Sequence, residues 1–203
     1  MLSAAEALQR LREGNGRFVG RLRDSGHAEV SFDLDQLVAD QRPFAIVLGC
    51  SDSRAPVEII FDQGPGDLFV VRVAGNIVAP SLIGSIEFAA TKFDTGLVVV
   101  LGHSRCGAIA ESLAVMRGET TAPSDNLQEI IASIGPTLES LPHTCDQNEL
   151  ARRATRANVE HSMRELLRRS EILSRLVDEQ RLTIVGAEYA LESGRVEFFA
   201  DGA

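Results

Sequence analysis

Apolar residues gather in four short runs that alternate with longer amphipathic segments. The runs begin at Phe44, Leu68, Leu97 and Leu182, and Gly, Pro or polar residues bound them. A short run that is apolar at nearly every position is typical of a strand buried on both faces. Helical spacing marks the segments at about 56–61, 81–93 and 105–116. Strands that alternate with helices predict an α/β fold with a mainly parallel sheet and helices on its faces.

The first part of the chain predicts an amphipathic helix. Residues 3–18 place their apolar positions at helical spacing, and Ser3 with Glu6 has the form of a capping box. We expect this helix to end near Gly14-Asn15-Gly16. Because no core precedes the first strand, the helix should pack on another part of the chain or on a second subunit.

The second half of the chain is mostly helical until its last strands. One helix is predicted at about 126–134, and residues 148–181, which lack Gly and Pro, predict a long helix or two joined ones. Residues 189–199 alternate around Ser193-Gly194 and predict a C-terminal hairpin. We expect a single domain over residues 1–203, in which residues 1–40 form a helical arm.

Composition narrows the range of partners. The 203 residues carry a formal net charge of -9, which disfavours binding to nucleic acid or to an anionic membrane. No segment approaches the length of a membrane span, and the N-terminus lacks the pattern of a signal peptide. Three cysteines fit a reducing compartment with free thiols. These features predict a cytoplasmic protein.

Residues able to bind a metal follow two of the predicted strands. Cys50 and Asp52 follow the first strand, and His103 and Cys106 follow the third. Functional groups collect at the carboxyl ends of parallel strands, so two thiols and one imidazole should meet at one edge of the sheet. Three such ligands with an open fourth position are typical of catalytic zinc. Asp52 is either the fourth ligand or a hydrogen-bonding partner beside it.

Other interpretations of these residues fit less well. Taken singly, each is more often a core cysteine, a helix cap or a loop histidine, but together at two equivalent strand ends they favour a joint role. Residues 102–107 have the outline of a phosphate loop, yet no Gly-Lys-Ser/Thr follows them. A cysteine phosphatase would place its arginine further along the loop than Arg54 stands from Cys50.

The motifs Cys50-Ser-Asp-Ser-Arg54 and His103-Ser-Arg-Cys106-Gly resemble the Cys-x-Asp-x-Arg and His-x-x-Cys motifs of β-class carbonic anhydrases. The resemblance continues through residues 62–72, 74–76 and 84–89 and the C-terminal hairpin. It therefore covers nearly the whole chain.

This resemblance implies a zinc enzyme that hydrates carbon dioxide to bicarbonate and a proton by attack of zinc-bound hydroxide. Cys50, His103 and Cys106 would hold one zinc ion per subunit. Asp52 would accept a hydrogen bond from the hydroxide, and Arg54 would keep that carboxylate ionised. In a closed form known among similar enzymes, Asp52 leaves the arginine and becomes the fourth ligand. Two thiolates offset the charge of Zn²⁺, so we expect activity to rise toward alkaline pH.

The resemblance also suggests a substrate pocket and an assembly. Gln63, Ala74, Val78 and Phe88 would bind carbon dioxide or line its pocket, some of them across a dimer interface, although Gln63 stands one position early. Val47 stands where some bacterial relatives have the tryptophan of an inhibitory bicarbonate site, so that regulation is not predicted. The family's smallest unit is a dimer, which implies a homodimer or a homotetramer here.

Two rival functions stay open. A hydrolase of carbon disulfide or carbonyl sulfide would keep the same fold and ligands and differ in the tunnel to the metal. A non-catalytic zinc or bicarbonate-binding module would not need the oriented Asp52-Arg54 pair. The remaining histidines and cysteine match nothing in the motifs, and they are His27, His143, Cys145 and His161. We expect His27 to be exposed to solvent and Cys145 to be a bystander thiol.

Overall fold

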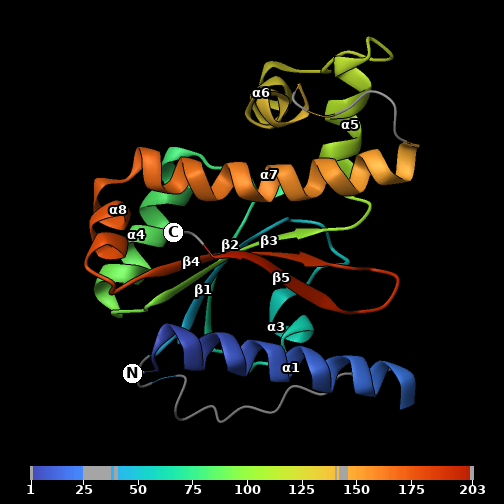
Figure 1. The fold of residues 1–203 in the computed structure, drawn as a ribbon. Coiled ribbons are helices and arrows are strands. Elements are labelled where there is room, and N and C mark those ends of the chain that lie inside the picture. Colours follow the sequence, from blue (N-terminus) through green and yellow to red (C-terminus); the bar gives the residue numbers. More distant parts are fainter. Residues whose placement is uncertain (1, 25–37, 39–40, 140, 142–145, 202–203) are drawn as a thin grey trace.

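A five-stranded sheet forms the centre of the computed structural model (Figure 1), which describes residues 2–24, 38, 41–139, 141 and 146–201. The strand order is β2-β1-β3-β4-β5, with the first four parallel and β5 antiparallel to β4. The strands are β1 (Ala45–Gly49), β2 (Leu68–Arg72), β3 (Leu97–His103), β4 (Thr183–Tyr189) and β5 (Val196–Asp201). Every residue of β1 and β3 is buried, as their continuous apolar runs predict. The expected α/β fold, with its C-terminal hairpin, is confirmed.

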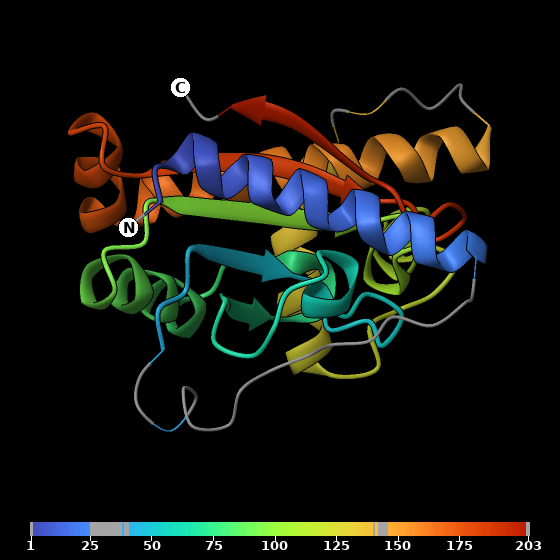
Figure 2. The ribbon, with the colours of Figure 1, turned by 90° about the horizontal axis from the view of Figure 1, so that it is seen from below.

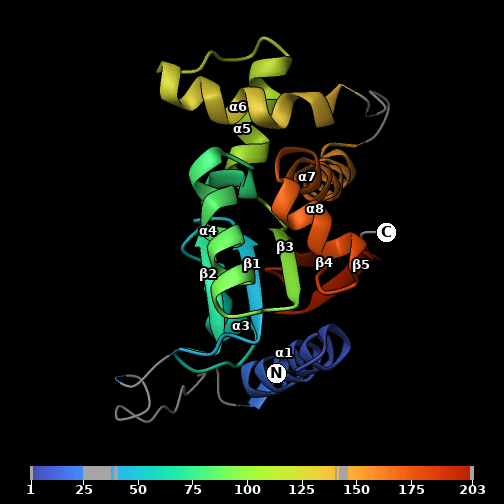
Figure 3. The same cartoon turned by 90° about the vertical axis from the view of Figure 1, so that its left-hand side faces the viewer.

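Helices cover both faces of the sheet, as Figure 3 shows in layers. One face carries α1 (Ala4–Asp24) and α3 (Val57–Ile60). The other face carries α4 (Pro80–Lys92), α7 (Gln147–Arg169) and α8 (Glu171–Asp178). Beyond α7 lie α5 (Gly107–Met116) and α6 (Asp125–Leu138), and a 3-10 turn, η1 (Ala74–Asn76), follows β2. In the part of the chain that the structure describes, no helix combines the length and the apolar character needed to cross a bilayer.

The N-terminal helix is longer than the sequence predicts. It continues to Asp24, so the predicted end at the Gly-Asn-Gly stretch is wrong. A Cβ atom at Gly14 would lie 1.8 Å from the carbonyl oxygen of Phe61, so this glycine allows a close approach of two segments and does not end the helix. Asn15 is buried, and its side-chain amide donates to the carbonyl oxygen of Gly194 at 2.8 Å. Figure 2 shows α1 running along the sheet of its own chain, where its apolar face joins the core.

The segment 148–181 forms two joined helices rather than one. Ser170 separates α7 from α8, and its hydroxyl accepts a hydrogen bond from the amide of Leu173 at 3.1 Å as an N-cap. The predicted helix at 126–134 extends to Leu138 and contains Pro136. His27, His143 and Cys145 lie outside the described residues.

Candidate metal centre and active site

The predicted metal ligands meet at the carboxyl edge of the sheet. Cys50 follows β1 directly, His103 is the last residue of β3, and Cys106 is the N-cap of α5. Because β1 and β3 are parallel neighbours, their ends bring the two ligand segments together. The ligand atoms of these three residues all lie within 4.8 Å of one another. The residues are 6%, 1% and 4% exposed, respectively, so the cluster is screened from bulk solvent.

One ring nitrogen of His103 is hydrogen-bonded and the other has no hydrogen-bond partner among the described residues. Its Nδ1 lies 2.9 Å from the carbonyl oxygen of Ser104, which fixes the tautomer with the proton on Nδ1. Its Nε2 is buried and has no hydrogen-bond partner among the described residues. Buried polar atoms are normally satisfied, so an unpartnered nitrogen beside two thiols fits a site that receives a metal ion.

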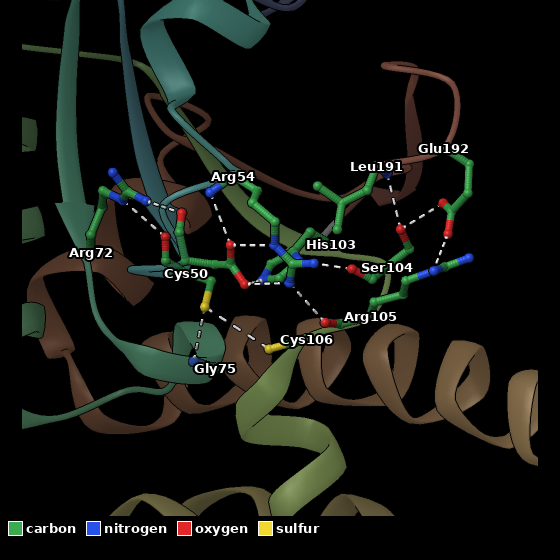
Figure 4. A network of polar contacts seen from close by, with 11 residues as sticks. Cys50, Arg54, Arg72, Gly75, His103, Ser104, Arg105, Cys106, Leu191 and Glu192 are labelled. Carbon is green, nitrogen blue, oxygen red and sulfur yellow. Dashed lines mark hydrogen bonds and ion pairs between the residues drawn. The ribbon is translucent and has the colours of Figure 1, made fainter.

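The two thiols form a close pair. The sulfur atoms of Cys50 and Cys106 lie 3.9 Å apart, and the amide of Gly75 donates to the Cys50 sulfur at 3.3 Å (Figure 4). The contact with Cys106 lowers the pKa of Cys50, and the same contact raises the pKa of Cys106. A divalent cation stabilises thiolates at both positions. Two sulfurs and one imidazole nitrogen are the ligand types that zinc prefers, so the residues present fit this ion.

A carboxylate and a guanidinium lie next to the cluster. Arg54 donates from Nε and Nη2 to the two oxygens of Asp52 at 2.9 and 2.7 Å, and its backbone amide adds a third bond at 2.9 Å. The Arg54 side chain holds the pKa of Asp52 well below its usual range, so the carboxylate stays ionised. The nearer Asp52 oxygen is 3.9 Å from Nε2 of His103. Asp52 is thus paired with Arg54 and available as a hydrogen-bond acceptor beside the ligands.

Contacts that the sequence does not reveal support both ligand loops (Figure 4). Arg72 donates to the backbone carbonyls of Cys50 and Asp52 at 2.9 and 2.6 Å. Glu192, in the turn between β4 and β5, accepts from the Ser104 hydroxyl at 2.8 Å and from Arg105 at 2.7 Å. Arg72 and Glu192 therefore support the site. The signal in the sequence that could have indicated them is a charged residue at or just after the end of a predicted strand.

The four predicted pocket residues are distributed differently. Ala74 belongs to η1, directly before Gly75, and Val78 follows the same turn and is buried. Gln63 is buried elsewhere, where its amide donates to the carbonyl oxygen of Phe61 and accepts from Arg10. Phe88 is 51% exposed, and the centroid of its ring lies 6.2 Å from that of Phe69 and 5.7 Å from that of Phe93. Of the four, Ala74 directly precedes the glycine whose amide contacts the sulfur of Cys50, and Val78 packs in the core between the sheet and helices α4, α7 and α8.

A Cys-His-Cys cluster with an ionised carboxylate, at the carboxyl edge of a parallel sheet, defines a metalloenzyme site. A family model described as Carbonic anhydrase matches residues 45–196. Carbonic anhydrase 2 of Mycobacterium tuberculosis is 38% identical over 191 residues, which is 93% of this chain and 89% of the relative. The Carbonic anhydrase of Mycolicibacterium smegmatis is 36% identical over 197 residues, with 94% and 91% covered.

Solved structures agree with this at the level of the fold. A tetrameric β-carbonic anhydrase of Sordaria macrospora matches with a TM-score of 0.74 at 24% identity, over 98% of this chain and 100% of that one. The chain therefore belongs to the carbonic anhydrase family, and its fold and ligand cluster are those of the β class. It is an enzyme, a carbonate dehydratase that interconverts carbon dioxide and bicarbonate.

Proposed function

We propose that Cys50, His103 and Cys106 hold one zinc ion per chain and that Asp52 and Arg54 prepare the site for hydration of carbon dioxide. The observation that carries this proposal is the buried, unpartnered Nε2 of His103 within 4.8 Å of two cysteine sulfurs. A cluster built only for packing would leave no reason to bury an imidazole nitrogen without a partner.

Zinc held by these three ligands would lower the pKa of a coordinated water and so supply hydroxide for the hydration, less strongly than a site of three neutral histidines because two thiolates offset its charge. The chain's own contribution to the metal site is to fix its ligands. His103 is oriented by its Nδ1 bond to Ser104, and the backbone that carries Cys50 is held by Arg72. These supports preserve the ligand geometry and the tautomer that leaves Nε2 free.

Asp52 supplies a hydrogen-bond acceptor next to the ligands. Because Arg54 engages both of its oxygens, the carboxylate is ionised and held in one orientation. A hydroxyl group that donates to this carboxylate turns a lone pair away from it, toward the substrate. Arg54 is in turn fixed by a 3.2 Å bond to the carbonyl oxygen of Arg105, so the pair depends on the loop that carries two of the ligands.

The substrate side of the site includes residues from η1 and from a second subunit. Ala74 and Val78 line the approach for carbon dioxide in this proposal. Phe88 contributes across an interface, because its half-exposed ring contacts the rings of Phe69 and Phe93 in its own chain. Gln63 would act on substrate only after its two present hydrogen bonds change. A homodimer or homotetramer is therefore part of the proposal, as is a closed form in which Asp52 leaves Arg54.

Stopped-flow hydration of carbon dioxide tests this function directly. The protein is measured as purified, after zinc is stripped by a chelator, and after zinc is restored. Activity that disappears with zinc and returns with it supports the proposal. A protein that holds one zinc ion and shows no hydration at any pH would contradict it.

The same preparation discriminates the rivals. Release of sulfide from carbon disulfide or carbonyl sulfide, without hydration of carbon dioxide, would assign the chain to the hydrolases on this fold. Zinc or bicarbonate binding without turnover of any of these substrates would assign a binding module. The intact Asp52-Arg54 pair argues against that module, because a purely structural zinc site has no use for an oriented acceptor.

A further inference from the structure

Helix α7 makes two buried contacts with the η1 turn. Nδ2 of Asn158 donates to the carbonyl oxygen of Gly75 at 2.7 Å, and the Ser162 hydroxyl donates to the carbonyl oxygen of Asn76 at 3.0 Å. Both side chains are 1% exposed. Since the two residues are four positions apart, they project from one face of α7, and they hydrogen-bond to two consecutive carbonyls of η1.

The η1 turn that α7 holds also contacts the predicted metal ligand Cys50. Gly75 has a φ of 69° and Asn76 a φ of 43°, so both residues lie in the left-handed region. This conformation directs the amide of Gly75 at the sulfur of Cys50, 3.3 Å away (Figure 4). A Cβ atom at Gly75 would lie 2.9 Å from Cδ1 of Ile134 and 3.1 Å from Cβ of Ala108, so the turn is also enclosed from outside.

The helix that grips the turn is itself fixed on the sheet. A Cβ atom at Gly102 would lie 2.7 Å from Cγ2 of Val159, and one at Gly186 would lie 3.0 Å from Cγ1 of the same valine. Helix α7 therefore rests directly on β3, at the residue before the ligand His103. The helix therefore contacts both the η1 turn and the end of the strand that carries His103.

We propose that Asn158 and Ser162 are positioning residues that act through η1 to hold the Gly75 amide on the sulfur of Cys50. This inference rests on the proposed zinc site. An amide that donates to a thiolate withdraws electron density from the sulfur and orders it for the metal. Loss of the grip frees the turn, weakens the amide-sulfur contact and leaves Cys50 less ordered.

The test compares Asn158→Asp, which keeps the shape of the side chain and replaces its amide donor by a carboxyl group, and Ser162→Ala with the wild type. Thr155→Val is the matched control, because Thr155 is buried on α7 and its hydroxyl donates within that helix, to the carbonyl oxygen of Ala151 at 3.0 Å. Two properties are measured on the full chain: the rate at which a chelator removes zinc, and the thiolate-to-metal charge-transfer absorption after replacement of zinc by cobalt.

Zinc release should be about tenfold faster in Asn158→Asp, with a smaller increase in Ser162→Ala. The charge-transfer band should shift to lower energy in both variants, because an unbonded thiolate gives up an electron more easily. Thr155→Val should match the wild type in both properties. A general loss of packing would move the thermal unfolding temperature of the metal-free protein without moving the band.

Wild-type spectra and wild-type release rates in Asn158→Asp and Ser162→Ala would overturn the inference, and so would an equal shift in Thr155→Val. If Asn158→Asp fails to fold, Ser162→Ala decides. A wild-type protein that takes up no cobalt and shows no charge-transfer band would instead refute the proposed metal site, which keeps the two failures apart.

Discussion

The two loops that carry the metal ligands both continue the sheet, and they differ in the side chains that support them. The Cys50 loop continues the hydrogen bonding between β1 and β2, because the amide of Ser51 donates to the carbonyl oxygen of Val73 and the amide of Val73 donates to that of Gly49. Arg72 then clamps two carbonyls of this loop. The His103 loop also continues the sheet, because the amide of Ser104 donates to the carbonyl oxygen of Tyr189 at 2.9 Å. It is supported further by the β4–β5 turn, through the amide of Leu191 and the side chain of Glu192.

That second support is exposed and charged. Arg105 and Glu192, which pair at 2.7 Å, have side chains that are 73% and 50% exposed. Exposed ion pairs contribute little to stability and weaken as salt screens them, whereas hydrogen bonds that extend a sheet do not depend on salt. The Arg105–Glu192 pair should therefore be the part of these supports that salt perturbs.

The largest effect is expected where the two loops join, at the ligands. Cys50→Ser and Cys106→Ser each replace a soft sulfur by a hydroxyl oxygen that holds zinc poorly. Both variants should lose zinc and hydrate carbon dioxide no faster than the uncatalysed background. Zinc analysis and stopped-flow hydration measure this, and a variant that retains both zinc and activity would remove its cysteine from the ligand set.

The next largest effect is expected when the hydrogen bonds of Arg72 to the Cys50 loop are removed. Arg72→Met keeps the length of the side chain but deletes the donors to the carbonyls of Cys50 and Asp52. Zinc affinity or activity should fall about 10- to 100-fold, as for other residues that orient metal ligands. Arg164→Met, on the exposed surface of α7, is the matched control and should behave as wild type. Equal behaviour of the two variants would show that the clamp is dispensable.

A smaller and salt-dependent effect is expected at the hairpin. Glu192→Gln weakens the contacts with Ser104 and Arg105, so activity should drop only a few-fold at low ionic strength, consistent with about 0–1 kcal/mol for an exposed pair. The difference from wild type should shrink as salt is added. A difference that is independent of salt would mean that Glu192 acts by packing and not by charge.

The smallest effect is a pH-dependent change in stability on the hairpin strand β4. Burial raises the pKa of Glu188, although Arg152 and Arg156 act in the opposite direction. A carboxyl with a raised pKa binds its proton more tightly in the folded state, so its stabilising contribution is present below the unfolded pKa of about 4.3 and is lost as pH rises through the folded pKa. Glu188→Gln should therefore unfold at a higher temperature than wild type at about pH 8 and at the same temperature near pH 4.

Scanning calorimetry at the two pH values measures this difference. A variant that is less stable than wild type at the higher pH would reverse the sign and show that Glu188 is stabilised by its arginine neighbours rather than penalised by burial.

Much of the fold and the ligand cluster could be predicted because their signals are local. The strands are continuous apolar runs, and the ligands follow two of them directly, so placing the runs in a parallel sheet also places Cys50, His103 and Cys106. Asp52 and Arg54 are two residues apart, and their pairing needs no long-range information. The apolar runs place the ligands at one edge of the sheet, and the pairing of β1 with β3 then brings them to one point.

The remaining features depend on contacts between residues far apart in the sequence. Gly14 stands in a Gly-Asn-Gly stretch that is typical of a helix end. Its close approach to Phe61 instead requires a glycine inside a continuing helix. Asn158 is 83 residues from Gly75, and nothing near it in the sequence marks it as a partner of that turn. Such residues become visible only when the packing of α7 on the sheet is known.

Asp52→Asn, compared with wild type at equal zinc content, tests the central claim most directly. The substitution keeps the size of the side chain and removes the charge that Arg54 holds beside the ligands. The account predicts that the variant still binds one zinc ion per chain and that its hydration of carbon dioxide falls about a hundredfold. A zinc-loaded variant that hydrates carbon dioxide at the wild-type rate would contradict it.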